Sequence, residues 1–195
     1  MCLSYGVVIT EDAVPLLAPP ESLSDGVVSL RLWRREDVPA IVSAVDDQEI
    51  VTFLDRVPQP YGEADAHAWL DAVEVGWADG SFAGFAIEVE GRAVGSISMG
   101  LKPDRTIAEV GYWLAADVRG RGLTTRAARL LAGWALRDCG IERLELRADV
   151  DNVASQRVAE KAGFTREGVL RSQHYNPRIG RRVDYVMFSL LRCEI

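Results

Sequence analysis

The chain is poor in the residues that build disulfide frameworks and metal centres. Its 195 residues include three cysteines, far apart and with no Cys-x-x-Cys pair, and only two histidines. An odd number of scattered cysteines is typical of reduced thiols in an intracellular protein. His67 and His174 are too few to build a zinc centre. We therefore expect no metal, and cysteines that take no part in the chemistry.

Two further absences bear on location and organisation. Residues 1–26 contain no Lys or Arg, so they lack the basic start of a secretory signal. No apolar run approaches the roughly 20 residues that cross a bilayer. These absences favour a cytoplasmic protein with no membrane partner. Prolines interrupt the first segment, and the length suits one core, so we interpret 1–26 as a leader and 27–195 as a single domain.

Positive charge is scarce in the first part of the chain. The net charge of −7 argues against a general nucleic-acid-binding protein. Residues 1–118 carry 7 basic and 20 acidic side chains, a balance of −13, whereas residues 119–195 carry 15 and 9, a balance of +6. This segregation suggests an anionic ligand near the C-terminal part and a neutral or cationic ligand near the rest. Chance segregation of solvated charges explains the same numbers.

The hydrophobic pattern predicts alternating strands and helices. We expect strands at 27–33, 82–89, 93–101, 107–115, 143–150, 164–171 and 182–191. We expect helices at 36–46, 63–79, 123–137 and 152–162. The helix between the strands at 107–115 and 143–150 implies a parallel pair with a right-handed crossover. We predict an α/β (α+β) fold, a mixed sheet with helices on both faces.

The segment from Val118 to Thr125 carries the strongest signal for a ligand. It lies between an expected strand and an expected helix, and Gly120 and Gly122 let its backbone approach a ligand closely. The first N–H groups of a helix have no internal partner and favour negative charge. With Arg119 and Arg121 nearby, the segment predicts a phosphate-binding site. An ordinary strand-to-helix turn is the alternative, and the P-loop and Rossmann fingerprints are both absent.

Three blocks in this order resemble the GNAT acetyltransferase superfamily. Residues 119–124 (RGRGLT) resemble the loop that binds the acetyl-CoA pyrophosphate, with Thr124 where Gly or Ala is usual. Residues 152–164 (NVASQRVAEKAGF) resemble the second GNAT block. Residues 108–114 (AEVGYWL) resemble a strand of the ribosomal-protein (RimJ/RimL-like) branch. The resemblance covers about 27–191 and implies a GNAT fold, whose central parallel strands splay apart.

The resemblance implies acetyl-CoA as co-substrate and gives residues roles in binding it. The backbone of Tyr112, Trp113 and Leu114 would pair with the pantetheine arm. Asn152 would hydrogen-bond the pantetheine amides, and capping the following helix is its alternative. The pyrophosphate would meet the loop and helix start, namely Arg119, Gly120, Arg121, Gly122, Leu123, Thr124 and Thr125. Candidates for the 3′-phosphate are Arg126, Arg129, Arg157 and Lys161.

Acetyl transfer to an amine requires a neutral amine, a stabilised oxyanion and a protonated leaving thiolate. Glu109 is our candidate base, and its alternative is a solvated carboxylate or one paired with an arginine. In many GNAT enzymes a Tyr seven residues after the Asn is the acid, but here Ala159 stands there. The Rim-type pattern points instead to Ser155, whose alternative is a hydrogen bond to a carbonyl one turn back. Tyr175 is a weaker candidate acid.

The favoured function is direct acetyl transfer, in a ternary complex, to the N-terminal α-amine of a peptide or protein. The alternatives are the same chemistry on a small-molecule amine and a CoA-binding module without turnover. We expect the substrate walls near 45–61 and 173–181. The acidic residues 46–49 and Asp55 would attract a cation or simply face solvent. Arg178, Arg181 or Arg182 would suit a longer acyl donor, and a homodimer is an open alternative.

Overall fold

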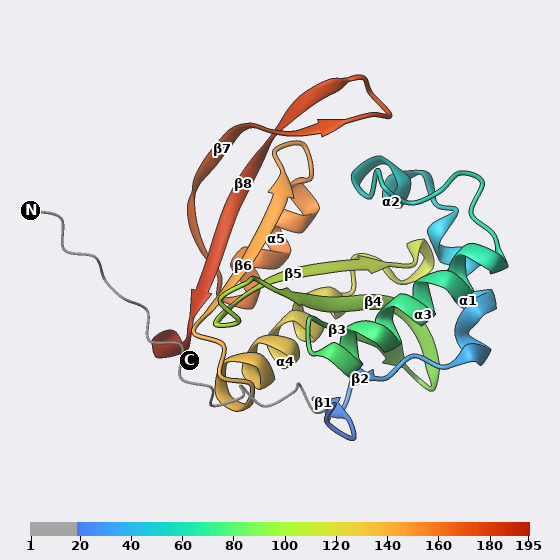
Figure 1. Ribbon diagram of the computed structural model, residues 1–195, viewed down its shortest axis with the longest axis horizontal. Helices are drawn as coiled ribbons and strands as arrows, with labels where there is room; N and C mark the ends of the chain where they lie inside the picture. The colour runs from blue at the N-terminus through green and yellow to red at the C-terminus, as the bar shows by residue number, and fades with distance from the viewer. Residues whose placement is uncertain (1–18) are drawn as a thin grey trace, which may run out of the picture.

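The computed structural model describes residues 19–195, which form one eight-stranded sheet with helices packed on it (Figure 1). The strand order is β1-β2-β3-β4-β5-β6-β8-β7. The strands are β1 (Leu23–Ser24), β2 (Ser29–Arg31), β3 (Phe82–Val89), β4 (Arg92–Leu101), β5 (Ile107–Leu114), β6 (Arg143–Asp149), β7 (Thr165–Asn176) and β8 (Arg181–Leu191). The helices are α1 (Val38–Val45), α2 (Gln48–Phe53), α3 (Glu63–Asp79), α4 (Leu123–Asp138) and α5 (Val153–Ala162), with short 3-10 turns at Arg35–Asp37, Ala116–Val118 and Arg192–Glu194.

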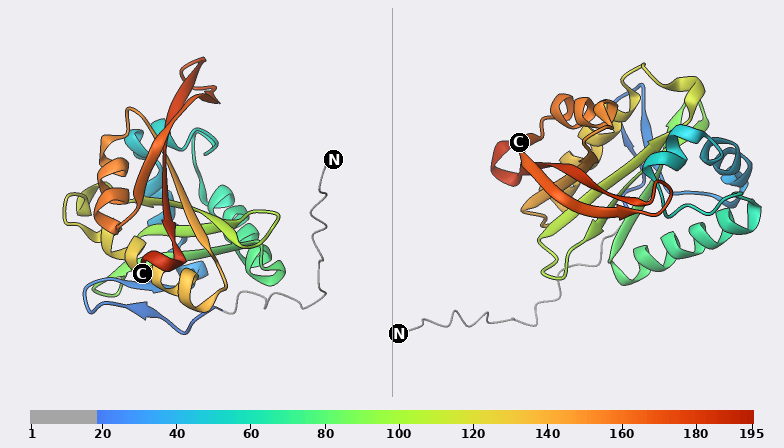
Figure 2. Two further views of the ribbon diagram at one scale, coloured as in Figure 1. Left: turned by 90° about the vertical axis from the view of Figure 1, so that its left-hand side faces the viewer. Right: turned by 90° about the horizontal axis from the view of Figure 1, so that it is seen from above.

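The predicted mixed sheet is confirmed. Within residues 19–195, β5 and β6 are the parallel pair, and the other neighbouring strands are antiparallel. Helices α4 and α5 lie on one face of the sheet and α1 and α3 on the other (Figures 1 and 2). The expected helix at 63–79 and strand at 82–89 agree with the structure residue for residue.

Four segments differ from the sequence-based expectation. The strand expected at 27–33 shortens to Ser29–Arg31, because it pairs with only three residues of β3. Helix α2 lies in a segment for which no element was expected. Strand β7 runs on to Asn176, so the expected loop at 173–181 is the end of a long hairpin. Strand β1 falls within the interpreted leader, of which residues 1–18 lie outside the described residues.

The parallel pair opens after three residues, and this opening creates the site. Strands β5 and β6 pair only at Ile107–Arg143, Ala108–Leu144 and Glu109–Glu145. Beyond that point β5 continues along β4 as far as Leu114, while β6 continues along β8 as far as Asp149. Because each strand keeps its other neighbour, the two diverge and leave a gap between their C-terminal halves.

Apolar packing of α4 on the sheet fixes one wall of this gap. Ala127, Leu131 and Ala135 have no exposed surface and point from α4 into the main core, where Leu144 and Phe188 lie. Small side chains at two of these three α4 positions let the helix lie close to the strands. No helix within residues 19–195 is long and apolar enough to cross a membrane.

Candidate functional site

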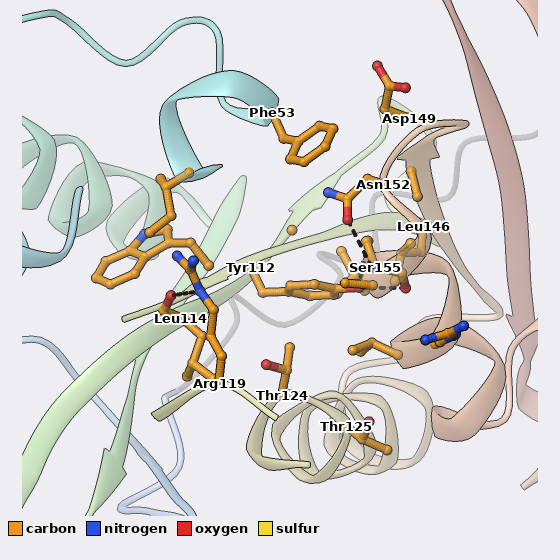
Figure 3. Close-up of a pocket in the computed structure, with 18 of the residues that line it drawn as sticks. Phe53, Tyr112, Leu114, Arg119, Thr124, Thr125, Leu146, Asp149, Asn152 and Ser155 are labelled. Carbon is orange, nitrogen blue, oxygen red and sulfur yellow. Dashed lines mark hydrogen bonds between the residues drawn. The ribbon is translucent and has the colours of Figure 1, made fainter. Parts of the chain in front are cut away.

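A cavity of about 420 Å³ occupies the gap between β5 and β6. Figure 3 shows Thr124 and Thr125 of α4 at one end, Phe53 and Asp149 at the other, and the Tyr112 ring between them. Its lining comes from α2, β5, the β5–α4 loop, α4, β6, α5 and β8. Of the predicted site residues it brings together Tyr112, Trp113, Leu114, Arg119, Gly120, Gly122, Leu123, Thr124, Thr125, Asn152 and Ser155. Glu109 and Arg121 are not in its lining.

The first N–H groups of α4 have no partner within the helix and border this cavity. Gly122 is the N-cap residue, with φ +75°, and no side chain caps the helix. Gly120 has φ +77°, and a Cβ built on either glycine would meet nothing within 4 Å. The left-handed backbone favours glycine here, and the open space leaves room for a ligand. The arrangement can bind an anion through the first N–H groups of the helix.

Arg119 does not point freely into the anion site. Its guanidinium donates to the Leu114 carbonyl at 3.1 Å and forms ion pairs with Asp47 and Glu49, each at 2.7 Å. Hydrogen bonding to Arg119 is the main cause that lowers the pKa of Asp47. Arg119 therefore connects the loop before α4 to the start of α2. The acidic residues Asp47 and Glu49 are occupied by this contact.

Ser155, Tyr112 and Asn152 form a hydrogen-bonded group in the middle of the cavity. The Tyr112 hydroxyl lies 2.8 Å from Ser155 Oγ and 3.2 Å from the Ser155 carbonyl. Burial raises the pKa of Tyr112 to about 12, so its phenol keeps its proton at neutral pH. Asn152 Oδ1 accepts the Ser155 N–H at 3.0 Å and caps α5. Ser155 thus bonds to Tyr112 rather than to a carbonyl one turn back.

Glu109 is held by two cations beside the cavity. It accepts hydrogen bonds of 2.6–2.8 Å from Arg147 and one of 3.0 Å from Lys102. Burial would raise the pKa of Glu109, but the hydrogen bonds and charges of Arg147 and Lys102 lower it overall. A carboxylate with a lowered pKa is a weaker proton acceptor. The base hypothesis for Glu109 stays a prediction, and the pairing with an arginine is what the structure contains.

The wall opposite the α4 loop lies partly in 45–61, where the sequence predicts a substrate wall, but the sequence predicts neither helix α2 nor the residues that β6 and β8 contribute. Ile50, Phe53 and Leu54 of the α2 region line the cavity, as do Asp149 at the end of β6 and its strand partner Tyr185 within β8. The available signal was Asp47, whose carboxylate accepts the N–H groups of Glu49 and Ile50 at 3.1 Å and caps α2. In the sequence Asp47 belongs to an acidic run that also suits solvent, and a six-residue helix is too short to show a clear period.

The remaining candidates separate by position. Arg157 and Lys161 line the cavity, whereas Arg126 pairs with Asp25 and Arg129 donates to the Lys161 carbonyl. Tyr175 is 52% exposed and lies outside the lining.

No group of three or more His, Cys, Asp or Glu side chains in the described part of the chain is placed to hold a metal ion. Burial raises the pKa of Cys139 to about 12.

Comparisons with known proteins identify relatives of this chain. A family profile described as an acetyltransferase (GNAT) domain matches residues 28–165. YdaF of Bacillus subtilis (strain 168), which carries a provisional name as a ribosomal N-acetyltransferase, is 38% identical over 87 residues, 45% of this chain and 46% of its own. The ribosomal-protein-serine acetyltransferase of Escherichia coli (strain K12) is 32% identical over 92 residues, 47% of this chain and 51% of its own. The chain thus spans about half the length of these two relatives.

Solved structures match over a longer stretch. A probable acetyltransferase superposes with a TM-score of 0.80 at 26% identity, over 89% of this chain and 98% of its own. RimL, a ribosomal alpha-N-protein acetyltransferase in complex with coenzyme A, superposes with a TM-score of 0.77 over 88% of this chain and 98% of its own. Its 22% identity establishes the likeness of fold alone. The profile match covers more than half of the chain, and the chain therefore belongs to the GNAT acetyltransferase family.

Proposed function

We propose that this protein transfers the acetyl group of acetyl-CoA to a primary amine by direct attack in a ternary complex, and that its substrate is the N-terminal α-amine of a polypeptide. One observation carries the proposal. A continuous cavity extends from the free N-terminus of α4, past Tyr112 and Ser155, to α2 and β8. It offers an anion site, a partly buried proton donor and a separate wall for a second substrate.

The residues present fit acetyl-CoA. The N–H groups from Gly122 to Thr125 would hold the pyrophosphate, and Arg157 and Lys161 add positive charge at the same cavity. The half of β5 that pairs with β4 but not with β6, including Tyr112 to Leu114, faces the gap in which a pantetheine arm would lie. Asn152 caps α5 with its oxygen, and its amide nitrogen makes no hydrogen bond within residues 19–195, so it can donate to an amide carbonyl.

When bound, acetyl-CoA supplies a thioester whose acyl carbon accepts the amine and whose sulfur leaves. Ser155 is the proton donor to that sulfur in this proposal. Tyr112 is protonated at neutral pH, as any phenol with a pKa of 10 or more is, and it can donate to Ser155 Oγ at 2.8 Å. The Ser155 proton is then free to point into the cavity. Tyr112 acts here as a positioning residue, beyond the backbone role expected from the sequence.

The preference for an α-amine rests on the state of the carboxylates. An alkyl amine has a pKa near 10 and needs a base at neutral pH, whereas an α-amine has a pKa of about 8 and is partly neutral already. Glu109 is bound to Arg147 and Lys102, and Glu49 is bound to Arg119. With these two carboxylates engaged, Asp149 is the lining carboxylate that forms no ion pair within residues 19–195, and the site suits the amine that needs less help. Two relatives are named as ribosomal N-acetyltransferases or ribosomal-protein acetyltransferases, which also favours a polypeptide substrate.

A thiol-release assay with acetyl-CoA tests the proposal directly. The acceptors are short peptides with free N-termini, the same peptides with blocked N-termini and one lysine, and small amines such as spermidine. We expect turnover with the free N-termini, and mass spectrometry should locate the acetyl group on the terminal nitrogen. Turnover confined to the lysine or the small amines would overturn the α-amine assignment, and no turnover with any acceptor would overturn the enzymatic proposal.

A further inference from the structure

The end of the β7–β8 hairpin concentrates positive charge. Residues 171–182 contain four arginines, Arg171, Arg178, Arg181 and Arg182, and no acidic residue. All four are exposed, although the chain as a whole has a net charge of −7. Arg56, in the loop after α2, is a fifth exposed arginine near the hairpin, because Arg178 donates to the neighbouring Val57 carbonyl. We call these five residues the arginine rim.

The hairpin end is anchored beside the substrate wall of the cavity. His174 Nε2 lies 2.7 Å from Asp55 Oδ2, and Asn176 Nδ2 donates to the Thr52 carbonyl at 3.3 Å. The His174 ring also stacks on Tyr185, which lines the cavity, with centroids 5.7 Å apart. Figures 1 and 2 show the hairpin end next to α2 in each view. The arginine rim therefore borders the end of the cavity that lies away from the α4 loop.

The charge of the rim is largely uncompensated. Arg56 and Arg171 form no ion pair or side-chain hydrogen bond within residues 19–195, and Arg181 meets Asp151 at 3.7 Å with both side chains at least 61% exposed. Arg182 donates to the carbonyls of Ser172 and Gln173, which neutralise no charge. The nearby Asp55 is bound to His174. Such a surface attracts an anionic partner.

We propose that the arginine rim binds an acidic segment of the polypeptide whose terminal amine enters the cavity. This inference rests on the proposed function and names its substrate class. An extended chain rises about 3.3 Å per residue, so Arg181 lies about 13 Å along β8 from Tyr185 at the cavity. The acidic side chains therefore belong at about positions three to six of the substrate. A nucleic acid offers no alkyl amine to the cavity, and the acidic remainder of the chain repels a long polyanion.

Matched peptides test the proposal. Two peptides share their first two residues, and positions three to six hold Asp and Glu in one and Asn and Gln in the other. We expect kcat/KM for the acidic peptide to be at least tenfold higher at low salt, and the ratio to shrink at high salt. Arg171→Glu and Arg181→Glu should each reduce the ratio about threefold or more without changing kcat/KM for the neutral peptide. Arg137→Glu, an exposed arginine on α4 with no polar partner in the described structure, is the control for net charge.

The outcomes separate the rim from the chemistry. Equal turnover of both peptides would overturn the rim and leave the acetyl transfer intact. Fluorescence anisotropy of the labelled acidic peptide measures binding without turnover, so the rim remains testable if no acceptor reacts. Binding that Arg171→Glu leaves unchanged would contradict it. An RNA oligonucleotide that displaces the peptide at a lower concentration, through the same arginines, would replace the polypeptide with a nucleic acid as the partner.

Discussion

At the scale of single residues, the Tyr112–Ser155 pair is the most specific element of the proposed chemistry. Ser155→Ala should lower kcat by at least about tenfold, because general acid catalysis contributes roughly 10²–10⁴-fold. Tyr112→Phe should lower kcat less, by about fivefold, because it removes one hydrogen bond that orients Ser155. The measurement is steady-state kinetics together with the affinity for acetyl-CoA, which should change little in either variant. An unchanged kcat in Ser155→Ala would return this residue to a structural role.

Glu109→Gln offers a second test at this scale. The pH dependence of its kcat/KM decides whether Glu109 is the base or only the ion-pair partner of Arg147 and Lys102. The lowered pKa means that the carboxylate is ionised throughout pH 6.5–9. Its ion pairs are lost only as the pH falls through the folded-state pKa, which lies below the ordinary value of 4.5. Glu109→Gln leaves Arg147 and Lys102 without their partner. We expect kcat/KM to fall about tenfold, by the same factor at pH 6.5 and pH 9.

A different pH profile would contradict that expectation. If Glu109 were the base, the deficit of Glu109→Gln would shrink as the pH rises, because the amine then loses its proton to solvent. The control is the affinity for acetyl-CoA, which should match the unaltered protein at both pH values. A wild-type rate would remove Glu109 from both roles.

At the scale of elements, α2 depends on one carboxylate. Asp47 caps the helix and binds Arg119, so Asp47→Ala should cost about 1 kcal/mol of stability and loosen α2. Urea unfolding and hydrogen exchange of residues 48–53 are the measurements. Asp46→Ala is the control, because the neighbouring Asp46 is exposed and makes no side-chain hydrogen bond in the described structure. Equal effects of the two substitutions would contradict the role of Asp47.

The length and apolar period of an element also determine whether the sequence predicts it. Long periodic segments such as α3 and α4, and the strands around the glycine loop, were predictable because their apolar spacing is regular. Helix α2 was not, since six residues carry no period and its cap resembled a run of solvated acids. The splaying of β5 from β6 was expected from the GNAT resemblance, but the point after Glu109 at which pairing ends and the Tyr112–Ser155 contact depend on tertiary structure. Residues 43 positions apart have no local pattern that joins them.

At the scale of the whole molecule, the β7–β8 hairpin contacts a segment that is far from it in the sequence. His174 and Asp55 lie 119 positions apart, and their contact holds the β7–β8 hairpin against the segment that follows α2. His174→Ala should raise KM for the amine by about threefold to tenfold, because one hydrogen bond is lost, and leave acetyl-CoA binding unchanged. Tyr175→Ala is the control, since Tyr175 is exposed and its hydroxyl makes no hydrogen bond in the described chain. Equal KM values for the two variants would contradict this anchoring role.

The central claim is that the open cavity at the start of α4 binds acetyl-CoA, and calorimetric titration tests it most directly. We predict micromolar binding, and we predict that Gly120→Ala weakens it at least tenfold. Gly91→Ala is the matched control, because Gly91 and Gly120 share a φ of +77° and both face open space, so each substitution costs about 1 kcal/mol of backbone strain. If Gly91→Ala binds acetyl-CoA normally and Gly120→Ala does not, the result supports binding in the cavity. Equal binding by both variants, or no heat with the unaltered protein, would contradict it.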